Sequence, residues 1–258
     1  MGNFNMDNWF TIERIDDETY SVGEYKHREE AHSYLLTGKT YSLLIDTGLG
    51  VSDIKTAINA ITDLPVSVVT THVHWDHIGG HKYFPNFGVH KFEEKWINGY
   101  FPLSLTAVKQ NLTAKPCEFP VNFNIDDYTV FQGKPKKIFV DNDVIDLDGR
   151  KIRIIHTPGH SPGHCCFYDE TKKYLFSGDL IYKGCLDMFY PTTDKNKFMQ
   201  SIKKTKRLDI LKILPAHHSL NIQPDIIEKI DNAFKALSIA GKFDISGIYD
   251  FGEFQLHI

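Results

Sequence analysis

Short apolar stretches, separated by charged or glycine-containing turns, fill the N-terminal part of the chain. Their β-branched and aromatic residues predict four strands, at 9–12, 20–22, 33–36 and 41–45. Apolar residues then recur at helical spacing from Val51 to Ile61, which predicts a helix that ends before Pro65. A continuous apolar run follows over 65–70 and is typical of a buried strand.

The C-terminal half alternates strands and helices in a similar way. Asp148-Gly149 is a hairpin-turn signal between two alternating stretches. Asp194 is a predicted N-cap, and Gly241 follows the last helical stretch. The predicted strands are 137–140, 143–146, 150–155, 165–168, 174–176, 210–214 and a closing strand at 248–256; the predicted helices are 194–207 and 224–240. We expect a layered fold of helices and sheets, in a single domain over residues 1–258.

An aromatic-rich stretch at about 88–140 is less regular than its surroundings. We interpret it as an insertion into the domain, partly helical near Phe92 and Trp96. Aromatic residues of this kind pack a core, or they form the lid or wall of an apolar pocket. The sequence leaves both interpretations open.

Metal-capable side chains are concentrated at the ends of the predicted strands. Three imidazoles and one carboxylate lie within six positions, at His72, His74, Asp76 and His77, after the strand at 65–70. The period of a strand points His72 and His74 the same way. Imidazole with carboxylate suits zinc, iron or manganese, and one metal needs about four ligands. Further donors follow other predicted strands, at Asp46, His156, His160, Asp179 and His217.

Composition narrows the class of partner. The net charge of −4 argues against a general nucleic-acid or membrane-surface binder. No apolar run reaches the ~18 residues of a transmembrane helix, and residues 1–7 show no signal pattern. The four cysteines form no Cys-x-x-Cys pair, which favours reduced thiols and a cytoplasmic location. We expect a small-molecule substrate, no nucleic-acid or membrane partner, and leave a homodimer open.

The chain resembles the metallo-β-lactamase superfamily. The resemblance rests on five stretches in the family's order: Asp46-Thr47-Gly48, the His72-to-His77 run, Pro158-Gly159-His160, Ser177-Gly178-Asp179 and Pro215-Ala216-His217. It implies an α+β four-layer αββα sandwich. It also implies two divalent metal ions, with zinc favoured and iron or manganese open. His72, His74 and His160 would hold one ion, Asp76, His77 and His217 the other, and Asp179 would bridge them. Asp46 would orient the site without binding metal. Ala216 stands where the family more often has Gly.

The same resemblance implies a hydrolase that uses a metal-bridging hydroxide, with Asp76 able to transfer a proton. Asp179 stands where class B1 β-lactamases carry Cys, which disfavours penicillin hydrolysis. Tyr182 lies three residues after Asp179, where acyl-homoserine lactonases have a Tyr that contacts the substrate carbonyl. We therefore expect a carbonyl ester, lactone or thioester as substrate, such as an acyl-homoserine lactone or an acyl-CoA. A phosphodiesterase, a mononuclear iron oxygenase acting on a sulfur substrate, and a metal-stabilised binding protein stay open as alternatives.

Overall fold

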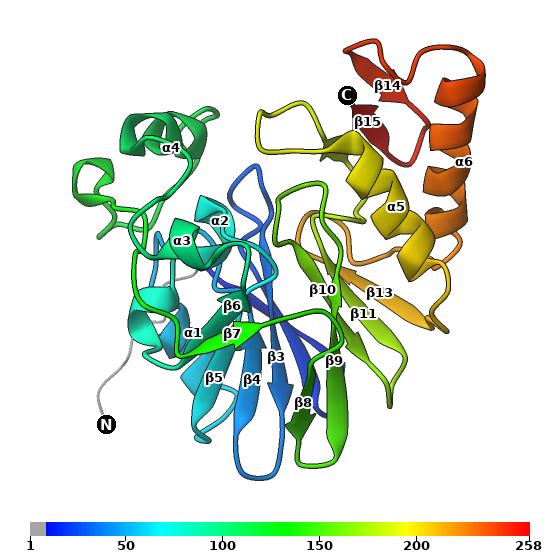
Figure 1. Cartoon of the computed structure of the whole chain (residues 1–258). Coiled ribbons are helices and arrows are strands. Elements are labelled where there is room, and N and C mark those ends of the chain that lie inside the picture. The colour runs from blue at the N-terminus through cyan, green and yellow to red at the C-terminus, as the bar shows by residue number, and fades with distance from the viewer. Residues whose placement is uncertain (1–8) are drawn as a thin grey trace. The chain divides into compact units, whose positions relative to one another are not determined.

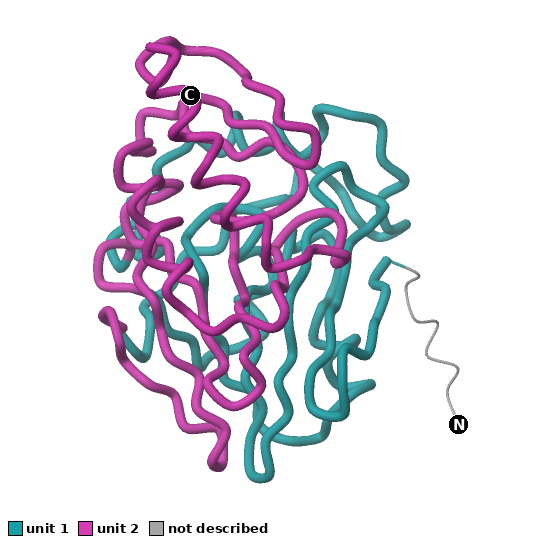
Figure 2. The backbone as a smooth tube through the Cα atoms, turned by 90° about the vertical axis from the view of Figure 1, so that its right-hand side faces the viewer, with its two compact units in different colours: residues 1–89, 94–138 teal, residues 90–93, 139–258 magenta. Residues whose placement is uncertain are grey.

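The computed structural model describes residues 9–258 and divides them into two compact units. The first unit holds residues 9–89 and 94–138, and the second holds 90–93 and 139–258 (Figure 2). Residues 1–7, which show no signal pattern in the sequence, lie outside the described residues. A single domain with an insertion at about 88–140 stays a prediction.

The first unit is built on a seven-stranded sheet in chain order, β1 to β7 (Figure 1). Strands β1 to β4 are antiparallel neighbours, and β4, β5 and β6 run parallel. The strands are β1 Thr11–Asp16, β2 Thr19–Gly23, β3 His32–Thr37, β4 Ser42–Ile45, β5 Val66–Val69, β6 Phe87–His90 and β7 Lys137–Phe139. The helices are α1 Ile54–Asn59, α2 Trp75–Ile78, α3 Glu94–Ile97 and α4 Leu105–Leu112, with 3-10 turns η1 His81–Tyr83 and η2 Ile125–Asp127.

The core of the first unit joins α1 to one face of this sheet. Ile54 and Ile58 of α1 pack with Leu35, Leu44 and Val68 of the central strands. Most aromatic residues of the stretch 94–138 pack against the cores of the same unit: the partly buried Phe119 and Phe123 pack beside Trp9, and Phe131 packs against the sheet core. Packing therefore explains most of the aromatic content, as one of the two interpretations expected.

The second unit holds a five-stranded sheet in the order β13-β11-β10-β9-β8 and a three-stranded sheet in the order β12-β15-β14. Helices α5 and α6 pack against each other. Their apolar residues, such as Phe198 and Phe234, form one core with Leu175 and Ile213 of the larger sheet. The elements are β8 Val144–Leu147, β9 Arg150–His156, β10 Cys165–Asp169, β11 Tyr174–Gly178, β12 Cys185–Asp187, α5 Lys195–Thr205, β13 Lys212–Pro215, α6 Ile226–Ile239, β14 Ile248–Asp250 and β15 Gln255–His257.

Several predicted elements agree with the structure, and some do not. Asp194 caps α5 by accepting from the Lys197 amide, and Asp148-Gly149 turns the β8–β9 hairpin with both residues at positive φ. The single closing strand at 248–256 is wrong, because β14 and β15 form an antiparallel hairpin that turns at Gly252 (φ 85°). Strands β6 and β12 and helix α4 were not predicted. Each is short, so periodicity gives little signal.

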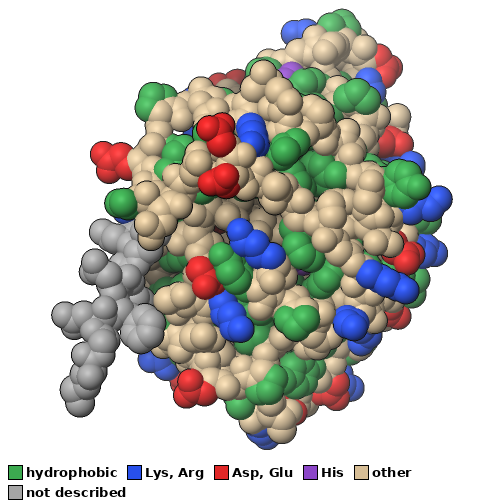
Figure 3. All heavy atoms as spheres, turned by 90° about the vertical axis from the view of Figure 1, so that its left-hand side faces the viewer, with side chains coloured by type: hydrophobic (Ala, Val, Ile, Leu, Met, Phe, Trp, Pro, Cys, Tyr) green, Lys and Arg blue, Asp and Glu red, His purple; other side chains and the backbone are tan. Residues whose placement is uncertain are grey.

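The surface carries both signs of charge. On the face shown in Figure 3, basic and acidic side chains are interspersed among apolar ones.

Candidate metal centre

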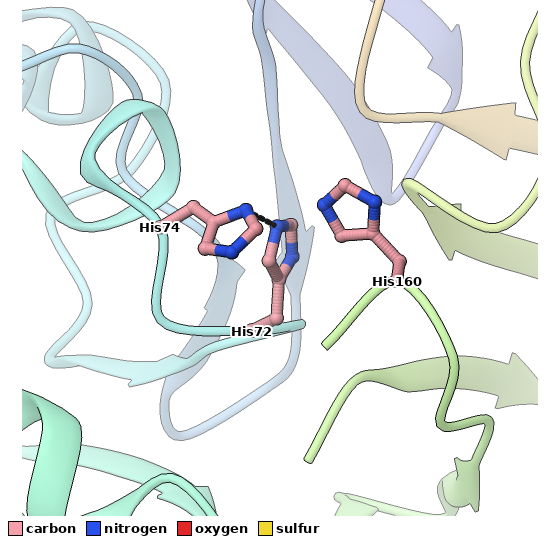
Figure 4. A group of neighbouring side chains, drawn as sticks. All are labelled: His72, His74 and His160. Carbon is pink, nitrogen blue, oxygen red and sulfur yellow. Dashed lines mark hydrogen bonds between the residues drawn. The ribbon is translucent and has the colours of Figure 1, made fainter. Parts of the chain in front are cut away.

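Four of the predicted donors lie between the end of β5 and the first turn of α2, in the first unit. β5 ends at Val69, so His72 and His74 are loop residues and the strand-period argument for their common direction is wrong. The loop nevertheless brings them together: His72 Nε2 lies 3.0 Å from His74 Nδ1 (Figure 4). His72 and His77 are also neighbours, with ring centroids 4.0 Å apart. Asp76 lies beside His77 at the start of α2.

The Asp46 carboxylate fixes this loop through hydrogen bonds. It accepts hydrogen bonds from the Thr71 amide (2.7 Å) and the Thr71 hydroxyl (2.6 Å), and it lies 3.0 Å from His77 Nδ1. A metal-binding histidine is commonly fixed in this way, with a carboxylate on one ring nitrogen and the metal on the other. The contact therefore engages Nδ1 of His77, and the orienting role of Asp46 toward a metal ion stays a prediction.

Glu24 supports the Asp46 turn, and it lies in no sequence motif that would reveal this role. The Leu49 amide donates to Glu24 Oε2 (2.8 Å) and the Trp9 indole donates to Oε1 (2.6 Å). Burial raises the pKa of Glu24 from 4.5 to about 7. Gly48 has φ +68°, and a Cβ there would lie 1.9 Å from Glu24 Oε2, so the turn tolerates only glycine at this position.

Two further residues surround these donors. The Trp96 ring stacks on His74, with centroids 6.4 Å apart, so the aromatic stretch does reach one donor. His81 lies between the hydroxyls of Thr47 and Thr70, each 2.7 Å from one of its ring nitrogens. Burial lowers the pKa of His81 to about 3. His81 is thus a neutral histidine with a structural role.

Three of the remaining predicted donors, His160, Asp179 and His217, lie together in the second unit. His160 follows β9, Asp179 follows β11 and His217 follows β13. His160 Nε2 is 3.3 Å from one Asp179 carboxylate oxygen, and His217 Nε2 is 3.2 Å from the other. His217 is buried, while the adjacent His218 is half-buried with φ +61°. The geometry places His217, rather than His218, beside Asp179.

The loop around His160 is held by groups outside the predicted set. Glu93 Oε1 accepts from the Gly163 amide (2.9 Å) and from the Ser161 hydroxyl. His164 Nε2 accepts from the Asp179 amide (3.0 Å), while its Nδ1 contacts the Thr157 hydroxyl (2.9 Å). Both ring nitrogens of His164 are thus engaged by neighbouring groups, which is a structural role. Glu93 was missed, because it is 67 positions before His160 and in no motif.

Tyr182 lies beside His217, with ring centroids 5.5 Å apart, and is buried. Its hydroxyl donates to the Cys185 carbonyl. A contact with a substrate carbonyl would require this hydroxyl to turn away from Cys185.

Imidazole and carboxylate donors of this kind fit zinc, iron or manganese. The first unit contributes four such side chains and the second unit three. A separate cavity of about 690 Å³ in the first unit is lined by Val51, Tyr83 and Tyr128, among others, and by none of these seven donors. This cavity is therefore not part of the proposed metal centre.

Comparisons with known proteins also relate the chain to a family of metal-dependent hydrolases. The family model of the metallo-beta-lactamase superfamily matches residues 28–217. The acyl-coenzyme A thioesterase MBLAC2 of Gallus gallus is 25% identical over 266 residues, covering 97% of this chain and 95% of the relative. A hydroxyacylglutathione hydrolase of Prochlorococcus marinus is 32% identical over 136 residues, which are 50% of this chain and 42% of the relative.

Among solved structures, a class B3 di-zinc metallo-beta-lactamase, LRA-12, from an Alaskan soil metagenome has a TM-score of 0.62 at 18% identity. The match covers 93% of this chain and 98% of that one. Likeness at this identity concerns the fold alone, and it confirms the expected metallo-β-lactamase fold. Among residues 9–258, no helix is both long enough and apolar enough to cross a membrane.

Proposed function

Because the chain belongs to the metallo-β-lactamase superfamily, a family of metal-dependent hydrolases, we propose that it hydrolyses an acyl thioester with the help of two divalent metal ions. The proposed ligands are His72, His74 and His160 for one ion, Asp76, His77 and His217 for the other, and Asp179 for both. Zinc is the proposed metal, since imidazole and carboxylate ligands suit it and it needs no redox partner.

The contacts of Asp179 carry the proposal of two ions. Each of its carboxylate oxygens faces a different histidine, His160 on one side (3.3 Å) and His217 on the other (3.2 Å). A carboxylate that served a single metal would not need its two oxygens directed to two separate imidazoles. The arrangement is the one expected of a bridging ligand between two ions, each with its own histidine.

The metal ions, when bound, supply an activated water and polarise the substrate carbonyl. The protein's own groups hold that chemistry in place. Asp46 keeps the proton on Nδ1 of His77 through the 3.0 Å contact, so that Nε2 is available as a ligand. The Asp76 carboxylate is the proposed group that moves a proton to the leaving group.

The substrate class rests on the relatives. The thioesterase of Gallus gallus matches this chain over nearly the full length of both proteins, whereas the hydroxyacylglutathione hydrolase matches about half of each. Both names describe cleavage of a thioester. We therefore propose an acyl-CoA or a similar acyl thioester, with a lactone as the second candidate because of Tyr182.

The test combines metal content with a substrate panel. Protein purified without chelator is assayed for metals and for turnover of an acyl-CoA, S-lactoylglutathione, an N-acyl homoserine lactone, bis-p-nitrophenyl phosphate and a cephalosporin. We expect at least two zinc ions per chain and the highest kcat/KM on a thioester. Turnover of the phosphodiester alone would favour the phosphodiesterase, and one iron with no hydrolysis would favour the oxygenase.

A matched pair of variants links the turnover to the centre. Asp179→Asn should abolish measurable thioester hydrolysis and reduce the metal content. Asp209→Asn makes the same chemical change at an exposed position and should leave both unchanged. Equal activity of the two variants would contradict the proposed role of Asp179.

A cytoplasmic location and a homodimer stay proposals. All four cysteines are free thiols, which supports a reducing compartment.

A further inference from the structure

The three-stranded sheet of the second unit carries a group of metal-capable side chains that the hydrolytic centre does not use. Strands β12 and β15 run parallel, with Leu186 opposite Leu256 and Asp187 opposite His257. Leu186 and Leu256 are fully buried in the core of the unit. Side chains alternate along a strand, so Cys185, Asp187 and His257 lie on the opposite face from these leucines.

On this face the three side chains are within reach of one ion. His257 Nδ1 is 2.8 Å from Asp187 Oδ1, and Cys185 Sγ is 3.7 Å from the same oxygen. One ligand atom from each of the three residues lies within 4.8 Å of the others, and all three residues are half-buried. Ligands of a single zinc ion, at about 2.0–2.3 Å from the metal, must lie this close to one another.

The backbone around these side chains is fixed on both strands. The Met188 amide donates to the His257 carbonyl (2.8 Å), and the Gln255 amide donates to the Gly184 carbonyl (2.8 Å). The Phe189 ring stacks on the His257 imidazole, with centroids 3.8 Å apart. A site whose ligands are already held in this way loses little conformational entropy when a metal binds.

We propose that Cys185, Asp187 and His257 form a further metal site, selective for zinc. A thiolate with an imidazole selects zinc over magnesium, calcium or manganese. The three protein ligands leave a fourth position for water or another ligand. This site is separate from the seven donors of the hydrolytic centre, all of which are histidines and aspartates.

A nucleophilic role for the same thiol has less support. Burial and the neighbouring Asp187 carboxylate raise the pKa of Cys185 to about 11, whereas a reactive cysteine needs a lowered pKa. A bound cation would neutralise the negative charge that the carboxylate and thiolate bring together. The chemistry of the group therefore fits a metal better than covalent catalysis.

The position of the site links it to the hydrolytic centre. The Asp187 carbonyl lies 3.4 Å from Nδ1 of His160, a proposed ligand of the first ion. A zinc ion on the Asp187 side chain would hold this stretch of β12, and with it the carbonyl that contacts His160. The expected role is structural support of a catalytic ligand.

The experiment uses the full chain loaded with cobalt(II), which reports on sulfur ligands. The proposed hydrolytic ligands include no thiol, so a near-ultraviolet thiolate-to-cobalt absorption band reports on the cysteine site. We expect this band in the wild-type protein. Cys185→Ser and His257→Asn should each lose the band, and each should bind about one metal equivalent per chain fewer than wild type. Cys117→Ser is the matched control, because Cys117 is also half-buried, and it should keep the band.

Absence of the band in the wild-type protein, or its persistence in Cys185→Ser, would overturn the proposal. Thermal unfolding of Cys185→Ser checks that this nearly isosteric variant is folded. If it is not, His257→Asn alone decides, since the His257 side chain is only partly buried and we expect this variant to fold. Because the band does not depend on turnover, a failure of the thioesterase proposal would leave this result unaffected.

Discussion

The replacement Asp46→Asn tests how the proposed metal ligand His77 is oriented, because His77 itself stays in place. Asp46 has φ +59°, a conformation that Asn tolerates as well as Asp does, so the backbone turn should survive the change. The amide has one acceptor oxygen in place of two. If that oxygen keeps the Thr71 amide, the new NH2 group faces Nδ1 of His77 at about the present 3.0 Å.

Two donors then face each other unless the His77 ring changes its tautomer. The change of tautomer would place the proton on Nε2 and remove that nitrogen from the metal. The loss of one hydrogen bond to a charged group costs about 1.5–3 kcal/mol. Since 1.4 kcal/mol is a factor of ten, the metal on His77 should bind about 10–100-fold more weakly, the range known for loss of such an outer partner.

Competition with a chelator of known zinc affinity measures this change, with Asp209→Asn as control. We expect one of the two metals to weaken in Asp46→Asn and kcat/KM to fall in parallel when zinc is limiting. Excess zinc should recover most of the activity. A variant whose two zinc affinities stay within twofold of wild type, with normal folding, would refute the orienting role of Asp46.

Three other variants test separate parts of the molecule. Burial raises the pKa of Glu24 to about 7, so the folded state holds this proton more tightly than the unfolded state does, and stability falls as pH rises from about 4.5 to 7. In urea unfolding, wild type should lose about 2–3 kcal/mol more than Glu24→Gln between about pH 5 and 8, and equal losses would contradict this. Tyr182→Phe should lower kcat on the best substrate about 100-fold if its hydroxyl stabilises the oxyanion, and an unchanged kcat/KM would remove Tyr182 from the chemistry. Asp169→Ala breaks a buried ion pair with Arg150 (2.6 Å) and should lower the free energy of unfolding by about 3–5 kcal/mol in the same urea assay. A loss below about 1 kcal/mol would contradict the expectation that the variant leaves Arg150 buried without its partner.

The sequence predicts the donors better than it predicts their positions. Histidine and aspartate at strand ends are local signals, and within the first unit the structure brings His72, His74 and His77 together as expected. The expected reason was wrong, since β5 ends at Val69 and a loop sets the directions of the rings. Local patterns report residue type and approximate element, while a loop conformation depends on contacts with distant segments.

The residues that support the loops could not be predicted from the sequence for the same reason. Glu24 and Glu93 belong to no motif, and each bonds an amide 25 or 70 positions away. Their bonds exist only once the sheets have formed, so a single sequence carries no periodicity that reveals them. The small sheet was missed for a related reason: β12 and β15 are three residues each, and they pair across 70 positions.

These supports share one feature, which explains how the loop residues of the proposed centre can be held rigidly. In each case a buried side chain accepts a hydrogen bond from a backbone amide of a donor loop: Glu24 from Leu49, Asp46 from Thr71, Glu93 from Gly163, and His164 from Asp179. A lost acceptor leaves a buried amide unsatisfied, at a cost of about 1–3 kcal/mol. We therefore propose that these four acceptors hold the proposed metal ligands in position, and we expect a change at any of the four to lower metal affinity while the ligand residues themselves stay the same.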